Sequence, residues 1–314
     1  MTTDIALRLR GLGKSYGQFT AVDAVDLDVA AGTVFALLGP NGAGKTTTVR
    51  MLATLIRPDR GSAEIFGYDV VGDATAVRSM IGLTGQYASV DETLTAGENL
   101  RLLGRLLGLT RRQAARRGAE LLAEFELSAV ADRPVGQFSG GMRRRLDLAA
   151  TLLTDPPLIF LDEPTTGLDP HTRDRMWAII GTLVGRGATV LLTTQYLEEA
   201  DALADRIAVI DRGAIVADGT AAELKSSLGN QVLRLELADA AQSARAEALV
   251  VSHTGRIPAG CASATLTVAL ADASAAADIV ADCRATGIAL RGFAVDRPDL
   301  NEVFRALTGT APAA

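Results

Sequence analysis

The segment GPNGAGKT at residues 39–46 decides the fold. It follows an apolar, strand-like run, TVFALL at 33–38, and precedes a helical stretch, TTTVRMLATLI at 46–56. Glycines leave backbone N–H groups free to surround phosphate oxygens, the lysine adds a positive charge, and the threonine offers a hydroxyl to Mg²⁺. The alternative is a turn that only joins strand to helix. The segment matches the phosphate-loop pattern at all eight positions, which disfavours this alternative. The predicted nucleotide-binding loop comprises Gly39, Pro40, Asn41, Gly42, Ala43, Gly44, Lys45, Thr46 and Thr47.

A second chemical segment is LIFLDEP at residues 158–164. Its four apolar residues predict a buried strand, and Asp162 and Glu163 follow at the carboxyl end, where ligands of open α/β sheets bind. Asp162 can share Mg²⁺ with Thr46, and Glu163 can face the water that attacks the γ-phosphate. Alone, the two acids would be interpreted as a solvated loop pair. The phosphate loop makes catalysis the stronger hypothesis.

Strand-like runs alternate with amphipathic helical stretches, which predicts an α/β protein with a largely parallel sheet. A helical block at about 88–155 predicts a subdomain inserted into a first domain at 1–226. After Lys225 the composition shifts toward alanine, and the pattern strand, helix, strand, optional strand, helix, strand predicts a small α+β domain of ferredoxin-like type at 227–314.

Composition excludes several classes of protein. A length of 314 residues predicts about two domains. The net charge of −6 gives no basic field for a nucleic-acid backbone, so no nucleic-acid partner is expected. No stretch reaches the roughly eighteen apolar residues of a membrane-spanning helix. The N-terminus lacks an apolar signal sequence, and Cys261 and Cys283 cannot form a disulfide framework, so we expect a cytosolic location.

The segment QFSGGMRRRLDLAA at 137–150 places a serine and two glycines before a helix, which is a second anion site. With the phosphate loop, it resembles the nucleotide-binding subunits of ABC transporters over about residues 4–226. Phe138 and Met142 replace the commonest Leu and Gln of that signature. The resemblance implies a P-loop NTPase fold of ABC ATPase type. It also implies a head-to-tail dimer in which the signature of one subunit, Ser139, Gly140 and Gly141, closes on ATP held by the other.

The resemblance assigns three further positions. Tyr16, in KSYGQFTAVD, would stack on adenine, with simple packing as the alternative. Gln86 would reach Mg²⁺ and the attacking water while its loop contacts a membrane subunit, and a polar loop residue is the alternative. Asp169 would contact the opposite phosphate loop across the dimer. It can equally cap the helix ahead of Pro170, and both roles can coexist.

One position departs from the family pattern. The segment TTQYLEEAD at 193–201 has Gln195 where the family usually has histidine contacting the γ-phosphate. We expect its amide to make that contact, and a solvent-facing strand end is the alternative. Together with QYASVDETLT at 86–95 and PDLNEVFRALTG at 298–309, this segment resembles the daunorubicin/doxorubicin-resistance type of exporter ATPase. The consecutive Arg143–Arg145 cannot share one helix face, and we expect them to be a solvated helix start.

The expected function is therefore an ATPase that dimerises, as a homodimer, around two ATP molecules with Mg²⁺. It would drive efflux of a drug-like or lipid substrate through a separate permease, from the cytoplasmic face of the membrane. One alternative is an ABC ATPase without a transporter, acting in nucleic-acid repair or at the ribosome. Its usual paired cassettes, coiled coils or zinc-binding cysteines are not evident in the sequence. The other is a nucleotide-gated regulatory module, against which Glu163 argues because binding alone needs no such carboxylate.

Overall fold

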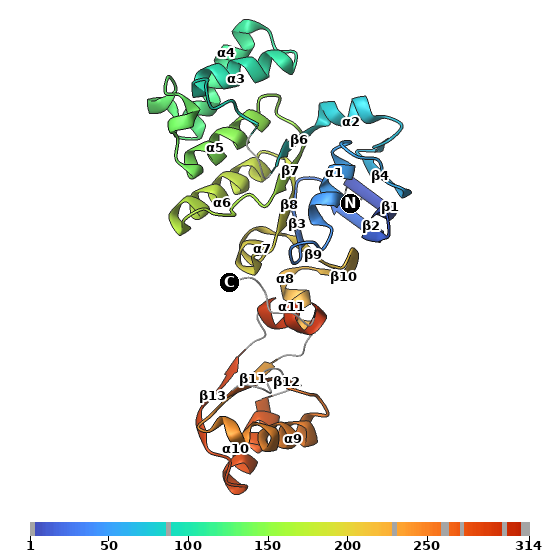
Figure 1. The fold of residues 1–314 in the computed structure, drawn as a ribbon, viewed down its shortest axis with the longest axis vertical. Coiled ribbons are helices and arrows are strands. Elements are labelled where there is room, and N and C mark those ends of the chain that lie inside the picture. The colour runs from blue at the N-terminus through green and yellow to red at the C-terminus, as the bar shows by residue number, and fades with distance from the viewer. Residues whose placement is uncertain are drawn as a thin grey trace. The chain divides into compact units, whose positions relative to one another are not determined.

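The computed structural model describes residues 4–85, 89–227, 231–258, 264–270, 273–296 and 300–308. The chain divides into two compact units, Met1–Asp218 and Gly219–Pro312 (Figure 1). The sequence-based boundary after residue 226 differs from this division. Helix α8 (Ala221–Ser227) falls in the second unit because it packs against α11 (Leu300–Thr308).

The first unit is built around a six-stranded sheet. In spatial order its strands are β10 (Ala214–Gly219), β9 (Arg206–Asp211), β3 (Val34–Leu38), β8 (Thr189–Thr194), β7 (Leu158–Asp162) and β6 (Ile81–Thr84). The pairs from β9 through β6 are parallel. Every residue of β3, β7 and β8 is buried, which explains their continuous apolar or threonine-rich sequences. At or directly after the carboxyl end of each of these three strands lie residues of the candidate site.

A second, antiparallel sheet lies beside the first. Its order is β2 (Phe19–Ala30), β1 (Ile5–Tyr16), β4 (Arg60–Ile65) and β5 (Tyr68–Asp69). Buried and exposed residues alternate along parts of β1 and β2, as is typical of strands that turn one face to the core and the other to solvent. Helix α1 (Lys45–Leu52) packs against β2 and β7, and α2 (Ala74–Met80) packs against β5 and β6. One apolar core joins these elements, including Leu7, Phe35, Met51 and Phe160.

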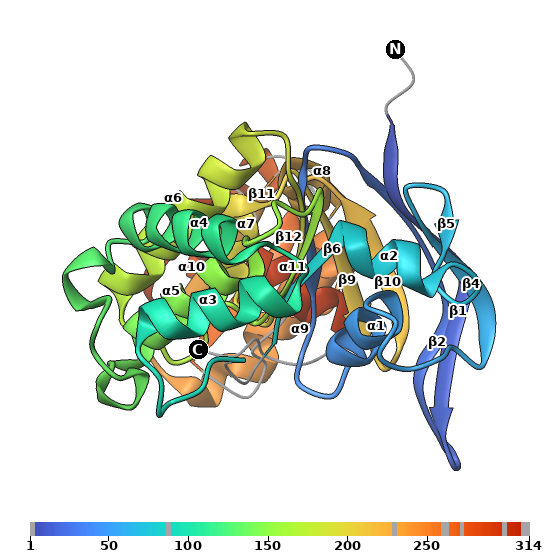
Figure 2. The ribbon, with the colours of Figure 1, turned by 90° about the horizontal axis from the view of Figure 1, so that it is seen from above.

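A helical subdomain is inserted between β6 and β7, as the sequence predicts. It contains α3 (Ala96–Leu106), α4 (Arg111–Glu124) and α5 (Gly140–Thr151), with short 3₁₀ turns at Ser128–Val130 and Val135–Gln137. Capping boxes at Thr95 and Thr110 start the first two helices. Seen from above in Figure 2, α3–α5 lie on one side of the central strands and the antiparallel sheet lies on the other. Helices α6 (Pro170–Gly185) and α7 (Leu197–Leu203) complete the unit.

The second unit is a small α+β structure, as expected. It contains β11 (Gln231–Leu237), a 3₁₀ turn (Ala240–Gln242), α9 (Ser243–Thr254), β12 (Thr265–Leu270), α10 (Ala273–Ala285) and β13 (Leu290–Asp296). The sheet order is β12-β11-β13, and all pairs are antiparallel. The described part of this unit holds three strands, because α10 begins too soon after β12 for an optional fourth strand. Cys283 lies in its apolar core, and Cys261 lies outside the described residues.

Within the described ranges, no helix has both the length and the apolar character that crossing a bilayer requires.

Candidate active site

The phosphate loop joins β3 to α1 at the carboxyl edge of the central sheet. The Gly39 N–H donates to the Thr194 carbonyl at 3.1 Å, which ties the start of the loop to the end of β8. Gly44 has φ of +107°, and a Cβ there would lie 2.4 Å from the Ala21 carbonyl oxygen. Only glycine fits this position. The strand, loop and helix therefore have the geometry that the sequence predicts.

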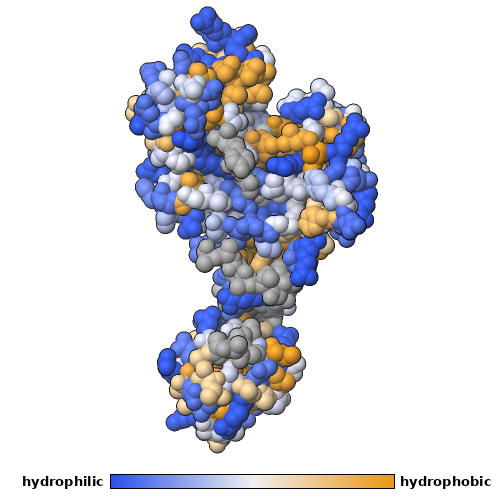
Figure 3. Space-filling view, viewed as in Figure 1, coloured by the Kyte–Doolittle hydropathy of each residue, from blue (hydrophilic) through white to orange (hydrophobic). Residues whose placement is uncertain are grey.

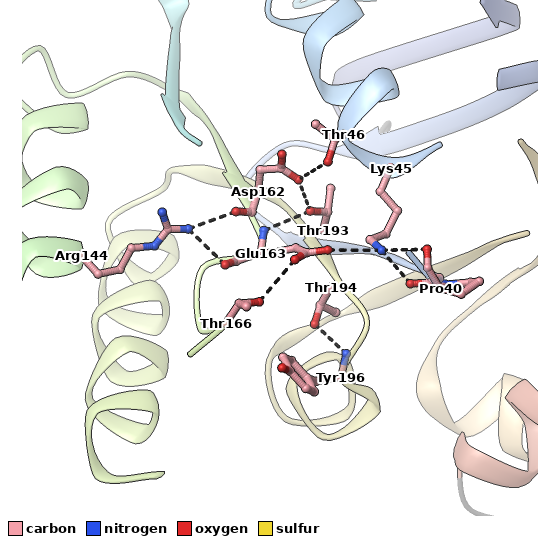
Figure 4. A network of polar contacts seen from close by, with 11 residues as sticks. Pro40, Lys45, Thr46, Arg144, Asp162, Glu163, Thr166, Thr193, Thr194 and Tyr196 are labelled. Carbon is pink, nitrogen blue, oxygen red and sulfur yellow. Dashed lines mark hydrogen bonds and ion pairs between the residues drawn. The ribbon is translucent and has the colours of Figure 1, made fainter. Parts of the chain in front are cut away.

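Lys45 lies inside this loop and is 4% exposed. Its Nζ donates to the carbonyls of Gly39 at 2.7 Å and Pro40 at 3.1 Å. It also lies 3.4 Å from Glu163 Oε1 (Figure 4). Burial lowers the pKa of Lys45, and the negative charges of Glu163 and Asp162 oppose this effect. A buried ammonium with backbone carbonyls as neighbours is well placed to exchange them for phosphate oxygens.

Asp162 ends β7 and is buried among hydroxyl groups. Its Oδ1 accepts hydrogen bonds from Thr46 at 3.2 Å and from Thr193 at 2.6 Å (Figure 4). These oxygens come from α1, β7 and β8. Mg²⁺ usually takes one or two carboxylates together with waters and substrate phosphates. The described residues contain no group of three or more His, Cys, Asp or Glu that could hold a metal ion by themselves. This oxygen set nevertheless fits Mg²⁺ bound together with a nucleotide.

Glu163 turns away from the strand direction. Its φ of +51° lies in the left-handed region, which is strained for a residue with a Cβ. The Glu163 N–H donates to the Thr193 carbonyl at 3.1 Å. The turn directs the carboxylate toward Lys45, and Thr166 Oγ1 donates to its Oε2 at 3.4 Å (Figure 4). The two adjacent acids at the end of β7 thus have different neighbours. Asp162 faces hydroxyl groups, whereas Glu163 faces the ammonium group of Lys45.

Arg144, which was not predicted from the sequence to belong to the site, binds the backbone of this turn. Its guanidinium donates to the carbonyls of Pro164 at 3.0 Å, Asp162 at 3.0 Å and Glu163 at 3.2 Å, and also to Gly85. A planar fork of N–H donors can satisfy several carbonyls at once, which a lysine cannot reproduce. The backbone of the strained turn is therefore fixed by a side chain from helix α5.

The expectation of a solvated helix start is wrong for Arg144 and Arg145. Burial lowers the pKa of both, and Arg145 donates to the Phe125 carbonyl at 2.9 Å. Arg143 is less buried and pairs with Glu92 at 2.7 Å. Consecutive helix residues point about 100° apart, so a run of three must direct some side chains toward the protein. This spacing could have predicted that at least one of the three arginines is buried. The sequence alone does not show which of them it is.

The signature residues begin helix α5. Ser139 caps the helix by accepting from the Met142 N–H at 3.2 Å. A Cβ on Gly141 would lie 2.7 Å from Thr172 Cγ2, and Thr172 donates its N–H and its hydroxyl to Asp169 at 3.0 and 2.7 Å. The structure therefore joins the signature to the Asp169 cap of α6. Helices α5 and α1 lie on opposite sides of β7 and β8, so the signature and the phosphate loop are separated (Figure 1).

The remaining predicted residues lie at the edges of the site. Tyr16 ends β1 and is 50% exposed, so its ring is not core packing. Lys14 Nζ lies 5.8 Å from the ring centroid. Gln195 directly follows β8 and is half-buried. It stands between Thr194 and Tyr196, whose N–H donates to the Thr194 hydroxyl at 2.9 Å.

Gln86 lies outside the described residues. Its nearest described neighbours are both held by α5. Gly85 accepts from Arg144, and Ser89 donates its N–H and hydroxyl to the buried Asp147 carboxylate, each at 2.7 Å. The helix of the signature motif therefore anchors the chain on both sides of the position predicted to contact Mg²⁺.

Comparisons with known proteins agree with this geometry. A family model described as "ABC transporter" matches residues 22–166. A second, described as "ATP-binding protein DrrA1-3-like, C-terminal domain", matches residues 219–308. The daunorubicin/doxorubicin resistance ATP-binding protein DrrA of Streptomyces peucetius is 52% identical over 97% of this chain and 92% of its own length. A Nod factor export ATP-binding protein I of Sinorhizobium fredii is 45% identical over 69% of this chain and 63% of its own length.

Solved structures give the same result for the first unit. The ATP-binding subunit of an ABC transporter matches with a TM-score of 0.64 and 30% identity over 71% of this chain and 92% of that one. An ATP-binding cassette solved as a dimer bound to ADP and phosphate matches with a TM-score of 0.63 and 27% identity over 68% of this chain and 98% of that one.

ABC ATPase domains bind ATP or ADP, and such subunits dimerise and work with membrane permeases. The P-loop α/β fold with a small C-terminal α+β domain, expected from the sequence, is confirmed. The family resemblance is confirmed over nearly the full chain, beyond the first domain. The chain belongs to the ATP-hydrolysing, ATP-binding subunits of ABC transporters, in the group of daunorubicin/doxorubicin-resistance ATP-binding proteins.

Proposed function

We propose that this ATPase works as a homodimer around two ATP molecules and drives efflux of a drug-like or lipid substrate through a separate permease. The observation that carries the proposal is the convergence of Lys45, Asp162 and Glu163 at one sheet edge. Full-length similarity to a drug-resistance ATP-binding protein supports the export direction. An ABC ATPase without a transporter, or a purely regulatory module, finds no support among these relatives. The chain would then be peripheral, at the cytoplasmic face of the membrane.

In this proposal each site residue has a separate task. Lys45 holds phosphate oxygens, and an entering phosphate competes with Glu163 for its ammonium group. The freed carboxylate of Glu163 then accepts a proton from the attacking water. Thr46 and Asp162 would hold Mg²⁺, which neutralises charge on the phosphates. Tyr16 stacks on adenine through its exposed ring.

The second subunit completes each site. Because α5 and α1 lie on opposite sides of the central strands (Figure 1), the signature residues would close on the nucleotide of the other chain. Asp169, which caps α6 beside Gly141, would contact the opposite phosphate loop from the same surface. A related cassette has been solved as a dimer.

Helix α3 offers the surface that we assign to the permease. Leu102 and Leu106 are 47% and 73% exposed, and Leu107 after the helix is also exposed. Apolar surface gathers over α3 in Figure 3. A cluster of large exposed apolar side chains marks a protein contact. The cytoplasmic end of a permease, which this family requires, is the occupant that we propose.

Changing Leu102 and Leu106 together to glutamine is expected to weaken association with the permease by at least about tenfold, because buried contact area is lost while helix propensity is kept. ATP hydrolysis by the isolated chain should stay within about twofold. Co-purification with the permease and basal ATPase assays measure the two effects. Ile257→Gln is the matched control, since Ile257 is 78% exposed in the second unit. Undiminished permease binding by the α3 variant would contradict this surface.

Replacing Gln195 by alanine is expected to lower turnover by about ten- to a hundredfold, because a hydrogen bond to a charged phosphate is lost. Gln195→His should retain more activity and add an ionisation near the unperturbed histidine value of about 6.5. Wild type should show no such ionisation from this position. ATPase rates measured against pH for all three proteins test the assignment, and an alanine variant at the wild-type rate refutes it.

A further inference from the structure

Glu199 is a buried acid that the proposed mechanism does not use. It lies in the first turn of α7 and is 0% exposed, whereas the side chain of its neighbour Glu198 is 75% exposed. The indole N–H of Trp177, from helix α6, donates to Glu199 Oε1 at 3.3 Å. Burying a carboxyl group costs free energy unless its polar atoms form hydrogen bonds or ion pairs. We therefore expect the buried Glu199 to have a role.

The second oxygen faces hydroxyl groups. Glu199 Oε2 and Thr165 Oγ1 are both buried, and neither makes a hydrogen bond with another described residue. Burial raises the pKa of Glu199 above its ordinary value of 4.5, and the neighbouring side chains of Thr194, Thr165 and Trp177 and the charge of Arg173 oppose the rise only in part. The two threonines and the indole thus surround one carboxyl group.

These neighbours belong to the segments that carry the reacting groups. Thr165 lies in the turn that begins with Glu163 and is itself buried. Thr194 ends β8, directly before Gln195, and its carbonyl accepts from the phosphate loop. The indole donor belongs to α6, which begins at the Asp169 cap. One carboxyl group therefore lies where three functional segments meet.

The charged groups around Glu199 do not neutralise it. Arg173 pairs with the exposed Glu198 at 3.4 Å and lies 5.2 Å from the Trp177 ring centroid. Arg144, whose charge also interacts with that of Glu199, donates to backbone carbonyls. No ion pair between described residues includes Glu199. A buried carboxyl without a cation is expected to keep its proton, which gives it one O–H donor and a carbonyl acceptor.

We propose that Glu199 is a positioning residue for ATP hydrolysis, whose protonated carboxyl group fixes the turn of Glu163 against the strand end that carries Gln195. Its carbonyl oxygen accepts from Trp177, and its O–H donates to the hydroxyl of Thr165. Glu199 does not touch phosphate. The inference rests on the roles proposed above for Glu163 and Gln195. It adds that the carboxyl group of Glu199 fixes the positions of these two residues relative to each other.

The first test compares two replacements of similar size. Glutamine can donate and accept as a protonated carboxyl does, so Glu199→Gln should keep kcat within about threefold. Methionine fills the space without hydrogen bonds, so Glu199→Met should lower kcat by about tenfold or more. KM for ATP should stay within about twofold in both, because the binding loop is untouched. Glu198→Gln, which removes the adjacent exposed acid, is the control.

Thr165→Val tests the partner without changing Glu199. The variant should reproduce the loss of kcat, and combining it with Glu199→Met should add little further loss, because both remove one interaction. A Thr165→Val protein at the wild-type rate overturns the proposed contact. If Glu199→Gln loses as much activity as Glu199→Met, the ionised carboxylate is required and the proposal is wrong.

Unfolding measured against pH tests the protonation state. A pKa raised in the folded protein adds stability that is fully present below the unfolded value of 4.5 and is lost as pH rises toward the folded value. The stability of wild type relative to Glu199→Gln should therefore decrease as the pH rises above 4.5, the ordinary pKa of a glutamate. A stability difference that does not change as the pH rises above 4.5 overturns the protonated form.

Glu163→Gln, assayed in parallel, separates this inference from the proposed function. If Glu163→Gln is inactive while Glu199→Met works at the wild-type rate, only the inference about Glu199 fails. If Glu163→Gln remains active, the proposed mechanism is wrong, and the inference about Glu199, which rests on that mechanism, is wrong as well.

Discussion

Replacing Glu163 by glutamine is expected to slow ATP hydrolysis by about 10²- to 10⁴-fold, because the group that accepts the proton of the attacking water is removed. ATP binding should persist, since the loop donors and the Thr46–Asp162 pair are unchanged. Affinity should be equal or higher, because Lys45 no longer has the Glu163 carboxylate 3.4 Å away. The variant should therefore accumulate as an ATP-bound dimer, visible by size-exclusion chromatography with ATP.

Glu198→Gln is a suitable control for this experiment. It removes the same charge from an exposed side chain on α7 and should leave the rate within about twofold. Turnover of Glu163→Gln near the wild-type rate would contradict its assignment as the base. Loss of ATP binding would instead show that the strained turn needs the carboxylate to fold.

The parts of the site that the sequence predicts are local. GPNGAGKT and LIFLDEP each combine a buried strand with its following turn, so pattern and spacing define both the element and its chemistry. Parallel pairing then brings the two strand ends to one edge, as the α/β pattern implies. The Asp162 contact with Thr46 follows from that topology.

The parts that the sequence could not predict depend on distant contacts. Arg144 reaches carbonyls of the Glu163 turn from another subdomain, and no periodicity distinguishes it from Arg143. Glu199 looks like one of two surface acids until α6 covers it. The domain boundary differs for the same reason, since the sequence of α8 does not say that it packs against α11.

Two other substitutions should each abolish turnover while affecting different steps. Lys45→Ala removes the buried cation of the phosphate loop and should prevent ATP-dependent dimerisation. Ser139→Arg places a bulky side chain at the start of α5, where the opposite nucleotide is expected to dock. It should leave ATP affinity of the monomer within about threefold, because α5 and the phosphate loop are apart in one chain. Isothermal titration with ATP and steady-state assays distinguish the two variants.

Mixing these two inactive proteins decides whether the signature acts between chains. In a heterodimer, the Ser139→Arg chain supplies an intact phosphate loop and the Lys45→Ala chain supplies an intact signature, so one complete site forms. Tagged Lys45→Ala protein should therefore capture untagged Ser139→Arg protein only when ATP is present. If the signature served the nucleotide of its own chain, both sites of the mixed dimer would be defective and ATP would cause no capture. Capture of wild type by tagged wild type under the same conditions is the positive control, and its success with failure of the mixed pair would exclude the head-to-tail arrangement.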